Sequence, residues 1–284
     1  MIRDSRIELW VEERGGKPAV NPIMSALLRA LTDDGAEASV KVPEREVHDP
    51  ANTGSGPDLV LLKSATDLAL SRSVAAEAAG TGFLNGASAT RRAHDKAAAA
   101  VATLAAAGLP VPETLLFQTG AEVSSMPQER GGWVAKPVRG VHGRGVTFHE
   151  SFANALAAPS EIEADGSFVA DDGTRLLQRR VGGDEPDLKV YVADGRCFAG
   201  RKRFDAGSYA RDEIEHVELE DETEAVVLGA GEALGLNCFG VDLRFDGGRP
   251  VIVDANPFPG YRGFPEAVGA LRAEVGRTLE AACR

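Results

Sequence analysis

The sequence has few cysteines and no long apolar run, and each absence excludes a class of protein. Its 284 residues include three cysteines, at positions 197, 238 and 283. An odd number at such wide spacing fits neither a disulfide framework nor a paired-cysteine metal site. No stretch approaches the roughly 20 apolar residues of a membrane helix, and the first ten residues lack the apolar centre of a signal peptide. We therefore expect a cytoplasmic protein with free thiols and no membrane partner.

Positive charge is scarce as well. Lys and Arg total 31 against 43 Asp and Glu, a formal net charge of −12, so the surface as a whole repels polyanions. This excludes a general nucleic-acid-binding surface, and any phosphate site must be local. The length suits one large domain or two to three small ones.

The first third of the chain alternates short strand and helix signals, the pattern of a small parallel α/β unit. Residues 7–11 and 59–62 predict strands, and Asn21 followed by Pro22 predicts a helix start. An alanine-rich helix is expected at about residues 90–107, followed by a proline-containing linker at 108–112.

Antiparallel hairpins are expected beyond the linker. From residue 133 onward, short apolar runs are separated by turns rich in Gly and Asp. A further hairpin is expected from residues 239–245 and 250–253, and a final helix begins near Pro265. The second part of the chain therefore predicts antiparallel sheets.

One glycine-rich loop carries a possible phosphate site. Lys136 ends a short apolar strand, and Gly140, Gly143 and Gly145 follow it. Glycines let the backbone approach a polyphosphate closely, and a lysine at a strand end supplies positive charge. The alternative is a hairpin turn with a solvated lysine. The loop is neither a Walker loop nor a Rossmann turn.

Two acids and an amide suggest a metal site. Asp242 lies in one strand of the expected C-terminal hairpin, and Asp254 and Asn256 lie at the end of the other. Carboxylate and amide oxygens are the ligands that Mg²⁺ takes when it also holds phosphates. The alternative is that the aspartates only end strands and start turns.

Basic residues gather in one segment of this acidic chain. Residues 175–203 contain eight bases against four acids, and strand alternation is expected to place Arg201 and Arg203 together on one face. Such a face could hold phosphates or an anionic substrate, or it could be a solvated hairpin. The eight bases are Arg175, Arg179, Arg180, Lys189, Arg196, Arg201, Lys202 and Arg203.

In their order along the chain these features resemble the ATP-grasp superfamily, and within it the glutamate-ligase-like branch. The resemblance extends over about residues 58–270. It implies an α/β (α+β) protein with the ATP-grasp fold, in which an N-terminal parallel α/β domain covers residues 1–88. A central lid domain is expected at 89–178 and a C-terminal antiparallel-sheet catalytic domain at 179–284.

The resemblance also implies roles for individual residues. Arg203 and Lys189 would act at the transferring phosphoryl group, and Asp242, Asp254 and Asn256 would bind metal. The expected nucleotide-binding residues are Lys96, Lys136, Gly143, Gly145, Gln178, Arg179, Arg180, Val181 and Asp187.

The implied activity is that of an ATP-dependent carboxylate–amine ligase that works through an acyl phosphate and releases ADP and phosphate. The expected cofactors are ATP and two Mg²⁺ ions, with Mn²⁺ as an alternative metal. The substrates would be a small carboxylate and amine or a peptide, nucleic acid is not expected as a partner, and a homo-oligomer is left open.

Departures from the family pattern keep an alternative open. Arg179 stands where the family usually has glutamate, Lys189 replaces an arginine, and Asp254 replaces a glutamate. Residues 256–261 and Lys63 are similar to the inositol phosphate kinases, which are also ATP-grasp proteins. A small-molecule kinase is therefore the alternative, although a strongly basic pocket is not evident outside residues 175–203.

Overall fold

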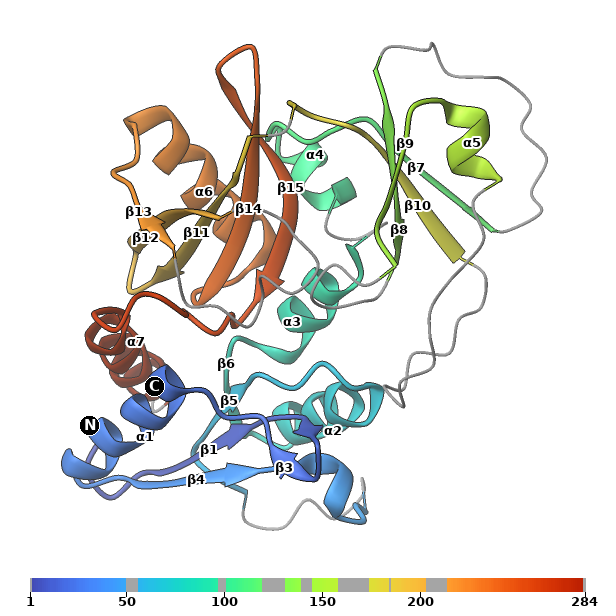
Figure 1. The fold of residues 1–284 in the computed structure, drawn as a ribbon. Coiled ribbons are helices and arrows are strands. Elements are labelled where there is room, and N and C mark those ends of the chain that lie inside the picture. The colour runs from blue at the N-terminus through green and yellow to red at the C-terminus, as the bar shows by residue number, and fades with distance from the viewer. Residues whose placement is uncertain are drawn as a thin grey trace.

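Three sheets form the framework of the chain, one parallel and two antiparallel (Figure 1). The structure is a computed structural model that describes residues 2–49, 56–96, 101–118, 131–138, 145–157, 174–183, 185–202 and 214–282. A short hairpin of β2 (Glu13–Arg14) and β3 (Lys17–Pro18) extends from the N-terminal sheet. This mixture of sheets confirms the predicted α/β (α+β) class.

The N-terminal sheet is parallel and has the strand order β4-β1-β5-β6. Side chains alternate along β1 (Arg6–Trp10), so Ile7 and Leu9 enter one core cluster while Trp10 enters the cluster on the other face. Both faces are therefore buried, as is usual for parallel strands. The neighbours of β1 are β4 (Glu37–Lys41), β5 (Leu59–Leu62) and β6 (Gly82–Leu84).

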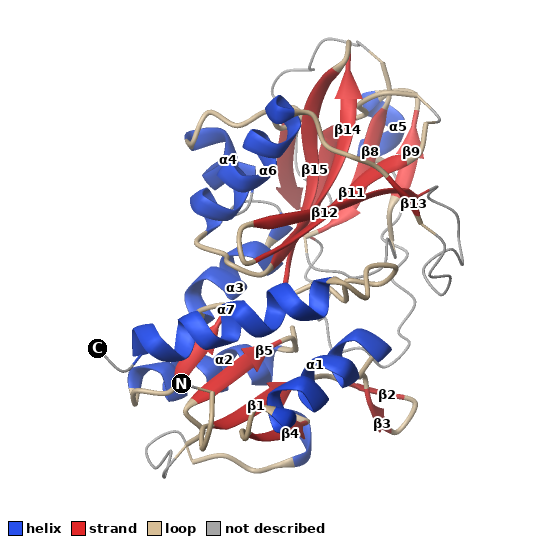
Figure 2. Ribbon diagram, turned by 90° about the vertical axis from the view of Figure 1, so that its left-hand side faces the viewer, coloured by secondary structure: helices blue, strands red, loops and turns tan. Residues whose placement is uncertain are grey.

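Helices from both ends of the chain cover one face of this sheet. In α1 (Pro22–Asp33), Asn21 caps the first turn by accepting a hydrogen bond from the backbone N–H of Met24. The last helix, α7 (Ala267–Ala282), packs beside α1 in the same core cluster (Figure 2). The other face is covered by α2 (Asp67–Ala78). The C-terminal helix thus completes the N-terminal layer.

The central sheet is antiparallel, with the order β7-β10-β8-β9. Trp133 and Leu177 pack with Phe152 of the short helix α5 (Phe152–Leu156) in a separate small core. The strands are β7 (Thr114–Gln118), β10 (Thr174–Arg179), β8 (Trp133–Pro137) and β9 (Thr147–His149).

The C-terminal sheet is antiparallel, and its two faces differ in character. Val190, Val241 and Ile252 belong to the apolar face, which packs against Val227 and Leu234 of α6 (Asp221–Leu234). The opposite face carries polar side chains and points toward the other two sheets. In order, the strands are β13 (Glu215–His216), β12 (Arg196–Lys202), β11 (Asp187–Ala193), β14 (Phe239–Asp246) and β15 (Arg249–Pro257).

The predicted hairpins and the final helix are confirmed, but the single long helix at residues 90–107 is wrong, because it is interrupted at Asp95; residues 97–100 of this prediction lie outside the described residues. The structure has α3 (Ala87–His94) and α4 (Ala102–Ala106), and α3 ends because Asp95 has extended backbone with ψ of 90°. Within the described residues, no helix has the length and apolar character to cross a membrane. The domain bounds at 88 and 178 stay a prediction.

Candidate active site

The candidate metal ligands lie side by side on the polar face of the C-terminal sheet. Asp242 of β14 and Asp254 of β15 are direct partners in the antiparallel register, and Lys189 of β11 is the partner of Asp242 on its other side. Register partners project from the same face of a sheet. The three side chains therefore form a row across three strands, and Asn256, two residues after Asp254, joins the same face.

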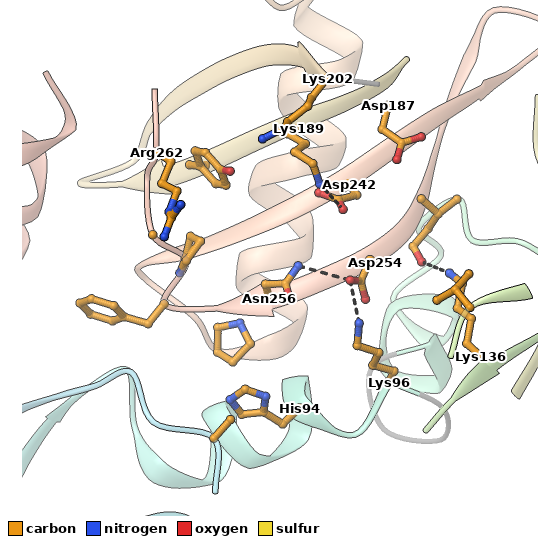
Figure 3. Close-up of a pocket in the computed structure, with 18 of the residues that line it drawn as sticks. His94, Lys96, Lys136, Asp187, Lys189, Lys202, Asp242, Asp254, Asn256 and Arg262 are labelled. Atoms are coloured by element: carbon orange, nitrogen blue, oxygen red, sulfur yellow. Dashed lines mark hydrogen bonds and ion pairs between the residues drawn. The ribbon is translucent and has the colours of Figure 1, made fainter. Parts of the chain in front are cut away.

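Ion pairs connect this row to the rest of the site (Figure 3). The Nζ atom of Lys189 lies 2.6 Å from Oδ2 of Asp242, and Nζ of Lys96 lies 2.9 Å from Oδ2 of Asp254. Asn256 Nδ2 donates to the same Asp254 oxygen over 3.3 Å. Burial acts to raise the pKa of Asp254, but the charges of Lys96 and Lys136 outweigh burial and hold this pKa below its ordinary value. Asp254 is thus a carboxylate near neutral pH, the form that binds cations.

Lys136 reaches the row from the central sheet. Its Nζ donates to the carbonyl oxygen of Val253 over 3.0 Å, next to Asp254. Burial lowers the pKa of Lys136, while the negative charge of Asp254 acts in the opposite direction. The backbone N–H of Lys96 donates to Val138 O over 3.1 Å, which ties the end of α3 to the strand that carries Lys136. Two lysines from separate elements therefore reach one site.

The end of β10 forms a second wall. Gln178 is buried, and its Oε1 atom has no hydrogen-bond partner among the described residues. Arg179 lies with its guanidinium 4.1 Å from the centre of the Trp133 ring and 2.8 Å from Glu113. Arg179 is therefore held by its own neighbours. The acceptor atom of Gln178 is available to a polar ligand.

Asp187 lies at the start of β11 and lines the same cavity. Burial raises its pKa, and the negative charge of Asp242 raises the pKa further. Arg244, two residues after Asp242, lies 3.6 Å from Asp187 and opposes this shift. Strand alternation places Arg244 on the face of Asp242 and was a signal that the sequence analysis did not use.

Apart from Trp133 and Glu113, which contact Arg179, all of these side chains line one cavity of about 520 Å³ between the three sheets. Gly145 does not line it but directly precedes Val146, which does. Gly143 and Arg203 lie outside the described residues. The predicted site residues that line the cavity are Lys96, Lys136, Gln178, Arg179, Arg180, Val181, Asp187, Lys189, Asp242, Asp254 and Asn256.

In the basic segment at residues 175–203, the bases of β12 that face the cavity are not the ones that the sequence predicted. In β12, Lys202 lines the cavity, whereas Arg201 is exposed and lies off it. The register explains the difference, because Lys202 pairs with Asp187 on the polar face and Arg201 pairs with Leu188 on the apolar face. The expectation that the Arg201 face holds phosphates is therefore wrong for Arg201. Arg175 and Arg196 also lie away from the cavity.

Sequence reasoning missed the cavity residues that come from the N-terminal part and from the turn after β15. Glu12, Arg14, Lys63, His94 and Arg262 all line the cavity. Of these, Lys63 was noted only for its similarity to the kinases. Glu12 and Arg14 are far from the other site residues in the sequence and meet them through packing of the N-terminal sheet against the C-terminal sheet. His94 and Arg262 are close in sequence to Lys96 and Asn256, and that proximity was the signal that could have found them.

The residues present fit ATP and a divalent cation. Two carboxylates on paired strands with a neighbouring amide supply hard oxygen ligands, a buried lysine faces them, and Gln178 offers an unpartnered buried acceptor. The described part of the chain contains no group of three or more His, Cys, Asp or Glu side chains that could hold a metal, and this site too has only two carboxylates with an amide. The paired aspartates with Asn256 are the candidate metal centre because of their oxygen ligands and their place in the cavity.

Comparison with known proteins agrees with this geometry. The chain is 28% identical over 201 residues to a probable alpha-L-glutamate ligase of Shewanella loihica, a match that covers 68% of this chain and 65% of the relative. It is 30% identical over 165 residues to a probable alpha-L-glutamate ligase of Marinobacter nauticus, with 56% and 50% covered. The chain thus spans less than two thirds of the length of these relatives. No family model matches it.

Solved structures show the same fold. The D-cycloserine synthetase DcsG superimposes with a TM-score of 0.69 at 21% identity, covering 98% of this chain and 99% of the other. A RimK domain ATP-grasp protein from Sphaerobacter thermophilus gives 0.68 at 21% identity, with 98% and 96% covered. D-alanine–D-alanine ligase from Bacillus anthracis, complexed with ATP, gives 0.67 at 15% identity, with 98% and 99% covered. The chain therefore has the ATP-grasp fold, and its sequence is similar to the probable alpha-L-glutamate ligases.

Proposed function

We propose that the protein is an ATP-dependent carboxylate–amine ligase that forms an amide or peptide bond and releases ADP and phosphate. The observation that carries the proposal is the row of Asp242, Asp254 and Asn256, which faces Lys96 and Lys136 in one cavity. Similarity to the probable alpha-L-glutamate ligases supports the same activity.

The reaction has two steps. An oxygen of the substrate carboxylate attacks the γ-phosphorus of ATP, the bond to ADP breaks, and an acyl phosphate forms. The amine nitrogen then attacks the acyl carbon, the bond to phosphate breaks, and the nitrogen loses a proton. No protein nucleophile is required. The protein contributes by placing cations around oxygens on which negative charge develops, and we assign this role to Lys96, Lys136, Lys189 and Arg203.

In this proposal the nucleotide occupies the part of the cavity that the end of β10 lines. Gln178, Arg179, Arg180 and Val181 border the adenine, and Asp187 binds the ribose. The glycines of the loop that follows Lys136, Gly143 and Gly145, cover the phosphates. The buried, unpartnered Oε1 atom of Gln178 supports the placement of a polar base edge beside it.

Asp242, Asp254 and Asn256 hold the metal in this proposal, as two Mg²⁺ ions, with Mn²⁺ as an alternative. When bound there, the metal would neutralise negative charge on the phosphates of ATP. The substrates are a small acid and amine or a peptide, and glutamate is the first to test because the curated relatives are named for it. We assign the enzyme to the cytoplasm and leave a homo-oligomer open.

The test is to trap the acyl phosphate. With an acid substrate, MgATP and no amine, added hydroxylamine should give a hydroxamate, and the complete reaction should release one phosphate for each ADP. Wild type and Asp254→Asn are assayed in parallel, so that contaminating phosphatase activity is subtracted. ADP formation with a stable phosphorylated product and no free phosphate would overturn the ligase proposal.

One observation favours the kinase alternative. Basic side chains from outside residues 175–203 do enter the cavity, namely Arg14, Lys63 and Arg262, and such cations could hold a phosphorylated alcohol. In that case the phosphoryl group stays on the product. The phosphate balance in the trapping experiment separates the two activities directly.

A further inference from the structure

The side chains on the polar face of the C-terminal sheet change along β11 from charged to largely apolar. Asp187, Lys189 and Tyr191 are two residues apart, so they project from the same face at intervals of about 7 Å and line the cavity together. The proposed function places the ribose at Asp187 and the transferred phosphoryl group at Lys189. In Figure 3, Arg262 of the turn after β15 lies across the cavity from Lys136. Tyr191 and this turn therefore border the part of the cavity that is left for the substrates.

Two glycines on this sheet leave space that larger apolar side chains fill. Gly240 is the register partner of Tyr191, and a Cβ atom at position 240 would lie 3.0 Å from the Tyr191 ring and 3.3 Å from Pro259. Gly200 lies on the neighbouring strand β12, and a Cβ atom at position 200 would overlap the side chain of Ile214. Tyr191, Pro259 and Ile214 therefore lie directly over the backbone of the sheet.

Val20 adds an apolar side chain from the N-terminal part of the chain. The next residue, Asn21, donates from Nδ2 to Gly260 O over 2.9 Å, which holds this segment beside the turn after β15. Val20 also packs against the same core cluster as Tyr191 and Ile214. All of these apolar side chains are half-buried and line the cavity. We call the following four residues the apolar end of the cavity: Val20, Tyr191, Ile214 and Pro259.

The cations that the N-terminal sheet, its hairpin and the turn after β15 bring to the cavity are engaged with other groups. Lys63 donates from Nζ to Phe258 O over 3.0 Å, and Arg14 lies 3.0 Å from Glu12. Arg262 also interacts with a further group of the chain. The apolar end, in contrast, has surface that only an apolar group can remove from water favourably. The reaction described above assigns no role to it.

We propose that the apolar end binds the apolar side chain of an amino-acid substrate, free or at the end of a peptide, beside the transferred phosphoryl group. This inference rests on the proposed ligase activity for the position of the nucleotide and of the reacting group. It predicts a preference for a side chain of about the size of leucine. Glutamate, for which the curated relatives are named, would place a charged carboxylate against this apolar surface, at a cost in desolvation.

Calorimetry on the full chain saturated with MgADP tests the proposal, with glycine, L-leucine and L-glutamate as probes. The three probes share an amine and a carboxylate, so a difference in affinity reports the side chain. L-Leucine should bind about tenfold or more tightly than each of the others, because only its side chain buries apolar surface without a charge. Binding of L-leucine that is no tighter than that of either other probe, or that is undetectable at about 20 mM, would overturn the proposal.

Variants locate the effect. Ile214→Ala and Val20→Ala should each weaken L-leucine binding by about threefold or more, because each removes methyl groups from the apolar end, while MgADP affinity stays within about twofold. Leu68→Ala is the matched control, because Leu68 is 44% exposed on α2 and does not line the cavity. Thermal unfolding checks each variant, and Pro259→Ala replaces one that does not fold. L-Leucine binding that is unchanged in two folded variants of the apolar end would overturn its assignment.

The two proposals fail separately in these experiments. Absence of the L-leucine preference, with hydroxamate formation intact, removes the role of the apolar end and leaves the ligase. A phosphorylated product without free phosphate, with the L-leucine preference intact, removes the ligase and leaves the apolar end as a binding site.

Discussion

At the scale of single residues, the charge of Asp254 organises the site. It pairs with Lys96, accepts a hydrogen bond from Asn256, and lies beside the carbonyl that binds Lys136. The same carboxylate supports the charged form of Lys136 against burial. A change at this one position should therefore affect the metal and both lysines together.

Asp254→Asn should reduce turnover by at least ~10²-fold, because it removes the negative charge that we propose binds the metal. The fold should survive, since the amide keeps the shape and part of the hydrogen bonding. Steady-state ADP release measures the effect, and circular dichroism provides the control for folding. Near wild-type ADP release would show that the metal assignment is wrong.

His94 predicts a pH-dependent loss of stability. Burial lowers its pKa from 6.5 to about 4, with Glu12 opposing the shift and Lys96 and Lys63 adding to it. Between pH 6.5 and 4 the unfolded chain therefore binds the proton more readily than the folded chain, so stability falls as the pH falls. His94→Gln should lack this component, which is roughly 3 kcal/mol at most.

Urea unfolding of wild type and His94→Gln at pH 7.5 and pH 4.5 measures this component. Lowering the pH from 7.5 to 4.5 should reduce the free energy of unfolding of the wild type more than that of the variant. An identical difference at both values would contradict the proposed pKa.

At the scale of elements, Asn85 joins the N-terminal sheet to the C-terminal sheet. This buried side chain lies between β6 and α3, donates to Cys238 O over 2.7 Å, and accepts from the backbone N–H groups of Asn237 and Cys238. The side-chain amide of Asn85 thus forms hydrogen bonds with three backbone groups just before β14. The position of β14, and hence of Asp242, depends on this contact.

Asn85→Ala should destabilise the fold by about 2 kcal/mol or more, because it leaves the backbone N–H groups of Asn237 and Cys238 without their acceptor, whereas Cys238 O still accepts from Phe258 N. Chemical denaturation measures the loss. Asn154→Ala is the control, since this asparagine is exposed on α5 and its side chain has no hydrogen bond among the described contacts. Equal stability of the two variants would mean that water replaces the Asn85 contacts.

At the scale of the whole molecule, three sheets share one cavity, and no single sheet contains a complete site. The central sheet brings Lys136 and Gln178, the C-terminal sheet brings the aspartates, and the N-terminal sheet brings Lys63. A ligand that contacts all three should therefore stabilise the folded chain as a unit.

MgATP at about 100 times its dissociation constant should stabilise the wild-type chain by ~2.7 kcal/mol and raise its melting temperature. Lys136→Met should reduce this shift at the same MgATP concentration, because the buried ammonium that faces the phosphates is lost. Lys17→Met is the control, since Lys17 is exposed on β3 and does not line the cavity. A shift of equal size in wild type and Lys136→Met would remove Lys136 from the nucleotide site.

The sequence by itself determined the features that depend on local pattern. Alternation and turn residues predicted most strands of both antiparallel sheets, although β7 and β13 were not predicted. Asn21 with Pro22 predicted the start of α1. The spacing of Asp242, Asp254 and Asn256 placed them together, because a hairpin brings the end of one strand beside the start of the other. The interruption at Asp95 escaped prediction, since nothing in the local alanine-rich pattern opposes a continuous helix.

Only the tertiary structure decided which distant residues meet the hairpin. Arg14 and Lys63 reach the cavity because the N-terminal sheet packs below the C-terminal sheet, and Arg262 reaches it because Asn21 anchors the turn after β15. Likewise, the register of β11 and β12 decided that Lys202 and not Arg201 faces the cavity. If the register of a strand shifts by one residue, each of its side chains moves to the opposite face of the sheet. The pairing of strands, which local sequence does not specify, therefore selects the cations that face the cavity.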